Sequence, residues 1–171
     1  LPHVRETVQT LQIEHKMLVG LTTGFNREIS DIICNSVGEQ GLWLDANVAG
    51  DDIKNGTGSR PNPFMIYENM HQLGVSPVQS VIKVDDTIEG VQEGINAGAW
   101  AVAVSDASNY TNVDSLEHWS QMSDIQREQH KKMSKIKLTK ESNAHYIIDN
   151  LSQLPDVIKN INQKMSRGIN P

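Results

Sequence analysis

The fold follows from one stretch of the sequence, Ser80-Val81-Ile82-Lys83-Val84-Asp85-Asp86-Thr87. An apolar run that ends in two acidic residues and a hydroxyl predicts a buried strand followed by a loop. Apolar residues then recur at helical spacing over residues 88–95 and stop at Gly98, which is typical of a helix and its C-terminal end. Residues 100–104 are apolar again. Strand, helix and strand in this order form a βαβ unit, which predicts a parallel sheet with a right-handed crossover.

The same alternation extends along the whole chain. Further strands are predicted over residues 17–21, 46–48 and 145–148, and further helices over residues 3–14, 26–41, 61–74, 123–141 and 155–165. Residues 50–59 and the polar segment after residue 104 are predicted as loops. This pattern indicates an α/β fold in which helices cover both faces of a parallel sheet.

Composition narrows the class of protein. A chain of 171 residues fits one domain with a sizeable core. Its net charge of −6 disfavours nucleic acid and anionic membranes as partners. The single cysteine, Cys34, excludes a disulfide framework. The sequence shows neither an apolar run long enough to span a bilayer nor a secretory signal, so we expect a cytoplasmic protein.

Polar residues follow the predicted strands at the edge where parallel sheets bind ligands, beyond their carboxyl ends. These residues are Thr22-Thr23-Gly24, Asp85-Asp86-Thr87 and Ser105-Asp106. Arg60 lies in a loop that leads into a helix. Hydroxyls, an arginine and a carboxylate pair at one edge predict a site for a small anion and a divalent metal.

Thr22, Thr23 and Arg60 are the candidates for binding the anion. Two hydroxyls and the free N–H groups of a following helix suit a phosphate oxygen. The alternative is a plain turn with local capping by the hydroxyls. Arg60 offers a planar fork for phosphate, and the neighbouring prolines restrict its loop. The alternative for a single loop arginine is a solvated side chain.

Asp85 and Asp86 are the candidates for binding the metal. Two carboxylates at a buried strand end repel one another unless a cation lies between them. Mg²⁺ fits, because it takes oxygen ligands and often shares them with a phosphate group. The alternative is that Asp86 caps the helix that begins near Thr87, while Asp85 faces solvent.

Several segments together resemble one family of enzymes. They are Leu21-Thr22-Thr23-Gly24-Phe25, Arg60-Pro61-Asn62-Pro63, Ile82-Lys83-Val84-Asp85-Asp86-Thr87 and Ala144-His145-Tyr146-Ile147-Ile148-Asp149. The resemblance is to the phosphonatases (phosphonoacetaldehyde hydrolases) of the haloacid-dehalogenase-like superfamily, and it covers nearly all of the chain. It implies a Rossmann-like core.

The resemblance also implies an activity: hydrolysis of phosphonoacetaldehyde to acetaldehyde and phosphate with Mg²⁺. In that family a lysine of a cap domain forms an imine with the aldehyde, and a core aspartate attacks phosphorus. Thr22 matches the hydroxyl that holds the phosphoryl group, with Thr23 beside it. Arg60 matches the cationic residue, and Asp86 matches the acidic metal ligand, with Asp85 beside it. The family precedent further implies a homodimer.

The chain departs from the family by an absence. We find neither the Asp-x-x-Gly-Thr segment that carries the nucleophile nor a lysine that matches the imine-forming one; Lys16, Lys54 and Lys83 do not. Residues 1–171 therefore resemble a partial hydrolase core, the C-terminal part of the enzyme without the first strand and the cap. We expect these residues alone to be inactive, with an unpaired slot between strands 17–21 and 80–84.

Two other interpretations remain open at the level of sequence. In one, the protein is a different haloacid-dehalogenase-like phosphatase. In the other, it is a catalytically silent core that acts as a binding module.

A smaller departure from the family is the segment 105–109, which replaces a glycine-bearing turn.

Overall fold

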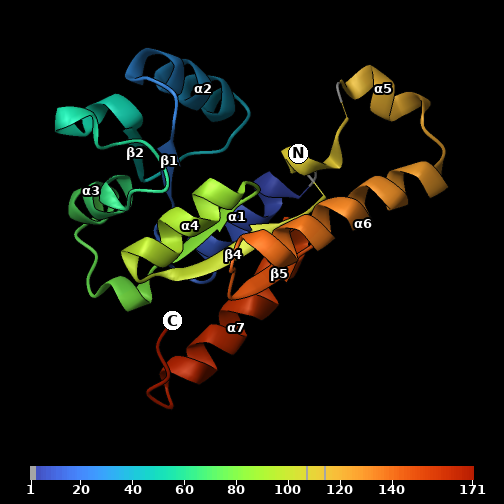
Figure 1. Cartoon of the computed structure of the whole chain (residues 1–171). Helices are drawn as coiled ribbons and strands as arrows, with labels where there is room; N and C mark the ends of the chain where they lie inside the picture. The colour runs from blue at the N-terminus through green and yellow to red at the C-terminus, as the bar shows by residue number, and fades with distance from the viewer. Residues whose placement is uncertain (1–2, 107, 114) are drawn as a thin grey trace.

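The strands form two separate parallel sheets. The computed structural model describes residues 3–106, 108–113 and 115–171. Strand β1 (Gly20–Thr23) pairs with β2 (Ala46–Ala49), and β3 (Ile82–Asp85), β4 (Trp100–Val104) and β5 (Tyr146–Ile148) form a second sheet in the order β3-β4-β5 (Figure 1). The α/β fold with parallel strands is confirmed.

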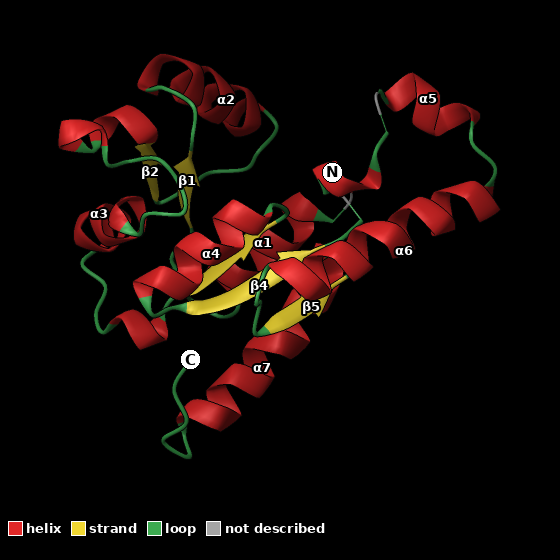
Figure 2. Cartoon of the chain, in the orientation of Figure 1, coloured by secondary structure: helices red, strands yellow, loops and turns green. Residues whose placement is uncertain are grey.

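In the part of the chain that the structure describes, seven α-helices connect and cover these strands. They are α1 (Val4–Ile13), α2 (Arg27–Glu39), α3 (Phe64–Leu73), α4 (Ile88–Ala97), α5 (Leu116–Gln121), α6 (Asp124–Glu141) and α7 (Leu154–Met165). Figure 2 shows β1 and β2 with α2 and α3 as one group, beside the larger group built on β3, β4 and β5. Helix α5 lies in the segment predicted as a loop, because its six residues are too few to show an apolar stripe.

The helix ends follow the capping signals in the sequence. The side chain of Asn26 accepts a hydrogen bond from the Ile29 N–H, and Ser123 forms a capping box with Gln126 at the start of α6. Gly98 ends α4 in the left-handed conformation, at a φ of 80°. One predicted helix start is wrong: α3 begins at Phe64, after the two prolines rather than with them.

Two strands begin two or more residues later than the sequence pattern predicts. Strand β1 begins at Gly20 instead of residue 17, and β3 begins at Ile82 instead of residue 80. Before β1, the Val19 N–H is bonded to the Asp45 carboxylate. Before β3, residues 78–80 form a 3₁₀ turn. Apolar character extends beyond the paired residues in both cases, which is why periodicity alone places the starts too early.

The core lies on the two faces of the three-stranded sheet. One face packs against α1 and α7 and contains Leu11, Val102, Val104, Ile148, Leu154 and Ile158. The other face packs against α4 and α6 and contains Val91, Ala101, Ala103 and Leu138. Alternate residues of β4 therefore point to opposite layers, as the two-residue period of a strand requires.

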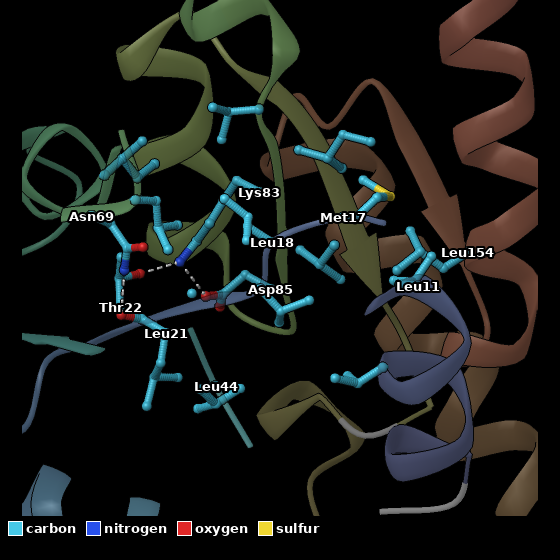
Figure 3. A pocket seen from close by; sticks show the side chains of 18 of the residues that line it. Leu11, Met17, Leu18, Leu21, Thr22, Leu44, Asn69, Lys83, Asp85 and Leu154 are labelled. Atoms are coloured by element: carbon cyan, nitrogen blue, oxygen red, sulfur yellow. Dashed lines mark hydrogen bonds and ion pairs between the residues drawn. The ribbon is translucent and has the colours of Figure 1, made fainter. Parts of the chain in front are cut away.

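A cavity of about 790 Å³ lies between the two sheets. Both β1 and β3 line it, together with apolar residues that include Leu18, Leu21 and Leu44 (Figure 3). This is the slot expected from the sequence.

Helix α2 shows the effect of the cavity on packing. Its residues Ile33 and Val37 line the cavity, whereas Ile29 and Ile32 are 42% and 63% exposed. The predicted apolar stripe of α2 is thus only partly covered. Within the described residues, no helix combines the length and the apolar character needed to cross a bilayer.

Candidate functional site

Five charged or hydroxyl side chains meet where β1 and β3 end. They are Thr22 of β1, Arg60 of the loop before α3, Lys83 and Asp85 of β3, and Glu93 of α4. We call this set the ion cluster. The parallel direction of the strands brings the carboxyl ends of both sheets to one edge, so residues far apart in sequence come together there.

Arg60 makes contacts on three sides. Its Nη2 donates hydrogen bonds to the Thr22 carbonyl oxygen at 2.7 Å and to the Thr22 Oγ1 at 3.3 Å. Its Nη1 lies 3.2 Å from Asp85 Oδ2, and its Nε lies 3.1 Å from Glu93 Oε2. The last contact is an ion pair rather than a hydrogen bond, because Nε lacks hydrogen-bonding alignment. Arg60 is therefore fixed in place, not solvated.

Lys83 points into the cluster toward Thr22 and Asp85 (Figure 3). Its Nζ donates a hydrogen bond to Thr22 Oγ1 at 2.6 Å and lies 3.2 Å from Asp85 Oδ2 and 3.0 Å from Glu93 Oε2. Thr22 Oγ1 in turn donates to Glu93 Oε2 at 3.2 Å. The Lys83 side chain is only 9% exposed and that of Glu93 is fully buried, so these charges are stabilised mainly by one another.

Asp85 is held by cations and hydrogen bonds together. Its Oδ1 accepts from the Thr87 N–H at 3.0 Å and from the Thr87 hydroxyl at 2.7 Å. Burial acts to raise the pKa of Asp85, but the charges of Lys83 and Arg60 outweigh it and lower the pKa. The carboxylate is therefore charged, and its side chain is only 8% exposed.

Asp86 has the opposite electrostatic environment. Burial and the negative charge of Asp85 raise its pKa. The side chain is half-buried and lines the same cavity as Thr22 and Arg60. The capping alternative is wrong for this pair: the Thr87 hydroxyl caps α4 by accepting from the Gly90 N–H at 3.1 Å, and Asp85 does not face solvent.

Three other residues predicted at this edge make local contacts. The Thr23 Oγ1 accepts a hydrogen bond from the Phe25 N–H at 3.2 Å, as in a turn that is capped locally. Ser105 donates to the Ile148 carbonyl, and Asp106 forms an ion pair with Lys131 at 3.1 Å. The structure thus brings Thr22, Arg60, Asp85 and Asp86 together and bonds Thr23, Ser105 and Asp106 to other neighbours.

Sequence reasoning missed two members of the ion cluster, Lys83 and Glu93. The sequence held one signal for Lys83. Both faces of a strand in a parallel sheet are covered, so a lysine within such a strand is buried and needs a carboxylate or another polar partner. Glu93 gave a weaker signal. It lies between two glycines of a helix, Gly90 and Gly94, on the side that packs closely against β3.

The charges at this edge suit one divalent cation. Two cations, Arg60 and Lys83, face three carboxylates, those of Asp85, Asp86 and Glu93. Among the described residues, no group of three or more His, Cys, Asp or Glu side chains is arranged as a metal site. Mg²⁺ does not need such a group, because it binds through one or two carboxylates and completes its shell with water and phosphate oxygens. Asp86 fits that pattern.

Comparison with known proteins defines the family. Residues 1–104 match the family described as haloacid dehalogenase-like hydrolase. The chain belongs to the haloacid dehalogenase-like hydrolases. The ion cluster, including Glu93, lies inside the matching residues.

The chain is similar to several proteins named phosphonoacetaldehyde hydrolase. One from Vibrio cholerae serotype O1 is 32% identical over 171 residues, which is 100% of this chain and 61% of the relative. One from Psychromonas ingrahamii is 35% identical over 153 residues, 90% of this chain and 50% of the relative. The chain thus spans half to three fifths of the length of these relatives.

Solved structures show the same likeness. The chain superimposes on a phosphonoacetaldehyde hydrolase-like protein from Oleispira antarctica with a TM-score of 0.89 at 31% identity, covering 100% of this chain and 60% of that one. A β-phosphoglucomutase-like structure from Thermotoga maritima matches with a TM-score of 0.61 at 19% identity, which shows the shared fold alone.

Proposed function

We propose that the protein hydrolyses the carbon–phosphorus bond of phosphonoacetaldehyde, giving acetaldehyde and phosphate. The observation that carries the proposal is the convergence of Arg60 and Lys83 on Thr22 at the edge where parallel sheets bind ligands. The similarity to proteins named phosphonoacetaldehyde hydrolase supports the choice of substrate.

In the proposed function, Thr22 and Arg60 bind the phosphoryl group. Arg60 is already oriented by Asp85 and Glu93, so its side chain loses little conformational entropy when the substrate binds. Its planar fork suits the oxygens of a phosphonate, and the Thr22 hydroxyl lies beside it. Thr23 is assigned to the same group through its hydroxyl: Oγ1 accepts from the Phe25 N–H, and its own proton is left to donate to a phosphoryl oxygen.

Asp86 is the proposed ligand of Mg²⁺. When bound, Mg²⁺ supplies positive charge that offsets the excess of carboxylates and the charge of the phosphonate. Burial and Asp85 disfavour the charge on Asp86, and a cation at its carboxylate removes that penalty. Asp85 lies beside this ligand, but both of its oxygens are already bonded within the protein.

Lys83 has a different role from an imine-forming lysine. Its Nζ donates to Thr22 Oγ1 and pairs with the carboxylates of Asp85 and Glu93. An amine that forms an imine must instead be free to reach the carbonyl carbon of the substrate. We therefore assign Lys83 to the electrostatics of the site and expect the imine, where it forms, on another lysine.

The experiment measures acetaldehyde and phosphate released from phosphonoacetaldehyde by the full-length gene product, with a phosphate monoester as the competing substrate. We expect release from phosphonoacetaldehyde that depends on Mg²⁺, and covalent trapping by borohydride in the presence of this aldehyde. Hydrolysis of the monoester alone would assign a phosphatase instead. Release from neither substrate would leave the binding module as the better description.

A variant pair tests the role of Arg60. Arg60→Lys keeps the charge and removes the fork, so we expect kcat/KM to fall about 10- to 100-fold, the range for a lost charge-assisted hydrogen bond. The matched control is Arg5→Lys, because Arg5 is exposed on α1 and bonds only weakly to the Gln40 carbonyl, at 3.4 Å. Equal activity of the two variants would remove Arg60 from the site.

A further inference from the structure

Two glycines of α4 allow the helix to approach β3. Gly90 and Gly94 are four residues apart and therefore lie on one face of the helix. A Cβ atom on Gly94 would lie 2.6 Å from the Cβ of Lys83. A Cβ atom on Gly90 would overlap all three atoms of the Asp85 carboxyl group. The space that a side chain at position 90 would take is thus occupied by the carboxylate of Asp85.

All the contacts of that carboxylate are internal to the protein. Oδ2 lies 3.2 Å from both Arg60 Nη1 and Lys83 Nζ. Oδ1 accepts two hydrogen bonds from Thr87. A carboxylate oxygen offers about two acceptor sites, so both oxygens are fully used. The carboxylate links the end of β3 to the loop that carries Arg60.

We propose that Asp85 is a positioning residue that holds Arg60 and Lys83 against Thr22, and that it reaches them only because residue 90 is glycine. The proposal rests on the proposed function, in which Thr22 and Arg60 bind the phosphoryl group. It separates the two neighbouring acids: Asp85 orients the cations of the site, and Asp86 remains for Mg²⁺.

A side chain at position 90 displaces the carboxyl group of Asp85. The neighbouring atoms belong to the flexible end of Asp85, so the carboxyl group moves away and the backbone stays. Arg60 and Lys83 then share a single buried partner, Glu93. Loss of one partner from a buried ion cluster is costly because a desolvated charge remains. Gly90→Ala and Asp85→Ala are therefore expected to cause the same defect.

The first measurement is thermal stability in a double-mutant cycle on the full-length gene product. Alanine is favoured over glycine in a helix, so Gly90→Ala is expected to raise Tm by about 2–4 °C in an Asp85→Ala background, where the space is free. In the wild-type background the same change is expected to lower Tm. Shifts of the same sign in both backgrounds would overturn the steric half of the proposal.

The second measurement follows the Arg60 Nη–H groups by NMR, because Nη1 is the guanidinium nitrogen that pairs with Asp85. We expect slow hydrogen exchange in the wild type and fast exchange in both Gly90→Ala and Asp85→Ala, because the guanidinium loses the partner that holds it. The exchanged pair Asp85→Gly with Gly90→Asp returns a carboxylate to the same space from the helix and is expected to restore slow exchange. Slow exchange in Asp85→Ala would overturn the positioning role.

The third measurement is kinetic and separates this proposal from the proposed function. We expect kcat for phosphate release to fall at least tenfold in Asp85→Ala with KM changed less than threefold, and the exchanged pair to recover most of that loss. An unchanged kcat per folded molecule would overturn the positioning role. A wild-type protein that releases no phosphate would refute the proposed function, while Tm and exchange still decide the coupling of residues 85 and 90.

Discussion

Glu93 is the residue on which the two cations of the ion cluster both depend. Its carboxylate is fully buried, pairs with Arg60 and Lys83, and accepts from the Thr22 hydroxyl. Because Arg60 comes from the first group of elements and Glu93 from the second, their pair connects the two sheets. Burial makes Glu93 necessary for stability: without it, the two desolvated cations share one remaining carboxylate, that of Asp85.

We predict that Glu93→Gln lowers the free energy of unfolding by about 3–5 kcal/mol, the range for breaking a buried ion pair from one side. Urea denaturation of the full-length gene product measures this. Glu89→Gln on the same helix is the control, because Glu89 is exposed and its loss is expected to cost less than about 1 kcal/mol. A Glu93→Gln protein as stable as the control would show that the cluster tolerates unpaired cations.

Asp86→Asn should affect metal use and not folding. Burial and Asp85 make the charge of Asp86 unfavourable, so a neutral side chain of the same size should leave Tm unchanged or raise it in metal-free buffer at pH 7. Removal of the charged ligand should weaken the apparent affinity for Mg²⁺ by at least tenfold. Titration of activity with Mg²⁺ measures the affinity. Wild-type activity at limiting Mg²⁺ would exclude Asp86 as the ligand.

Residue types predicted part of the site. Thr22, Arg60 and the two aspartates were found because hydroxyls, a proline-flanked arginine and paired carboxylates at strand ends are unusual in a purely structural role. Lys83 and Glu93 were missed because each lies inside a regular element, where a charged residue is ordinarily assigned to an exposed face. Their role depends on how closely α4 packs against β3, and no local sequence pattern specifies that distance.

At the scale of elements, the sequence was most informative where a side chain bonds directly to the backbone. The helix starts at residues 26 and 123 and the helix end at Gly98 were predicted correctly, since each depends on a local capping interaction. Strand starts depend on pairing partners. The start of β1 is set by its register with Ala46 of β2, which is far away in sequence.

His145 couples the pairing of β4 and β5 to pH. The ring nitrogen Nδ1 of His145 accepts a hydrogen bond from the Ala101 N–H at 2.9 Å. The backbone N–H of His145 donates to the Ala101 carbonyl at 2.9 Å. Burial and the positive charge of Lys164 lower the pKa of His145. The imidazole is therefore a neutral acceptor, and a proton on Nδ1 would remove one of the two bonds.

The depressed pKa of His145 determines the direction in which pH changes the stability of the folded protein. Because the pKa of His145 is depressed in the folded protein, the unfolded chain binds the proton more readily. The stabilisation contributed by neutral His145 is therefore fully present above the ordinary histidine pKa of about 6.5. It is lost as pH falls through the depressed value. We predict that Tm of the wild type falls more steeply below pH 6.5 than Tm of His145→Asn, which keeps an acceptor without a titration. Parallel Tm profiles for the two proteins would disprove this role.

At the scale of the molecule, the 171 residues taken alone are predicted to bind phosphate without turnover. Asp85 and Glu93 are ion-paired, and Asp86 is assigned to Mg²⁺, so none of the carboxylates at the site is free to attack phosphorus. The test compares phosphate release by residues 1–171 with release by the full-length gene product, and ³¹P NMR serves as the control for binding. Comparable turnover would mean that a residue of this chain is the nucleophile.

The division of the strands into two sheets has a consequence for local opening. Each sheet holds its own main-chain hydrogen bonds, whereas side chains around the cavity, the ion cluster among them, hold the sheets to one another. The β1–β2 group can therefore open while the β3–β5 group stays folded, as a cooperative unit of lower stability. In deuterated water, amide protons of Leu21 and Val48 should exchange well before those of Val102, which has a strand on both sides. Raising the salt concentration should widen that difference, because it weakens the partly exposed contacts of Arg60 and leaves the centre of the larger sheet unaffected.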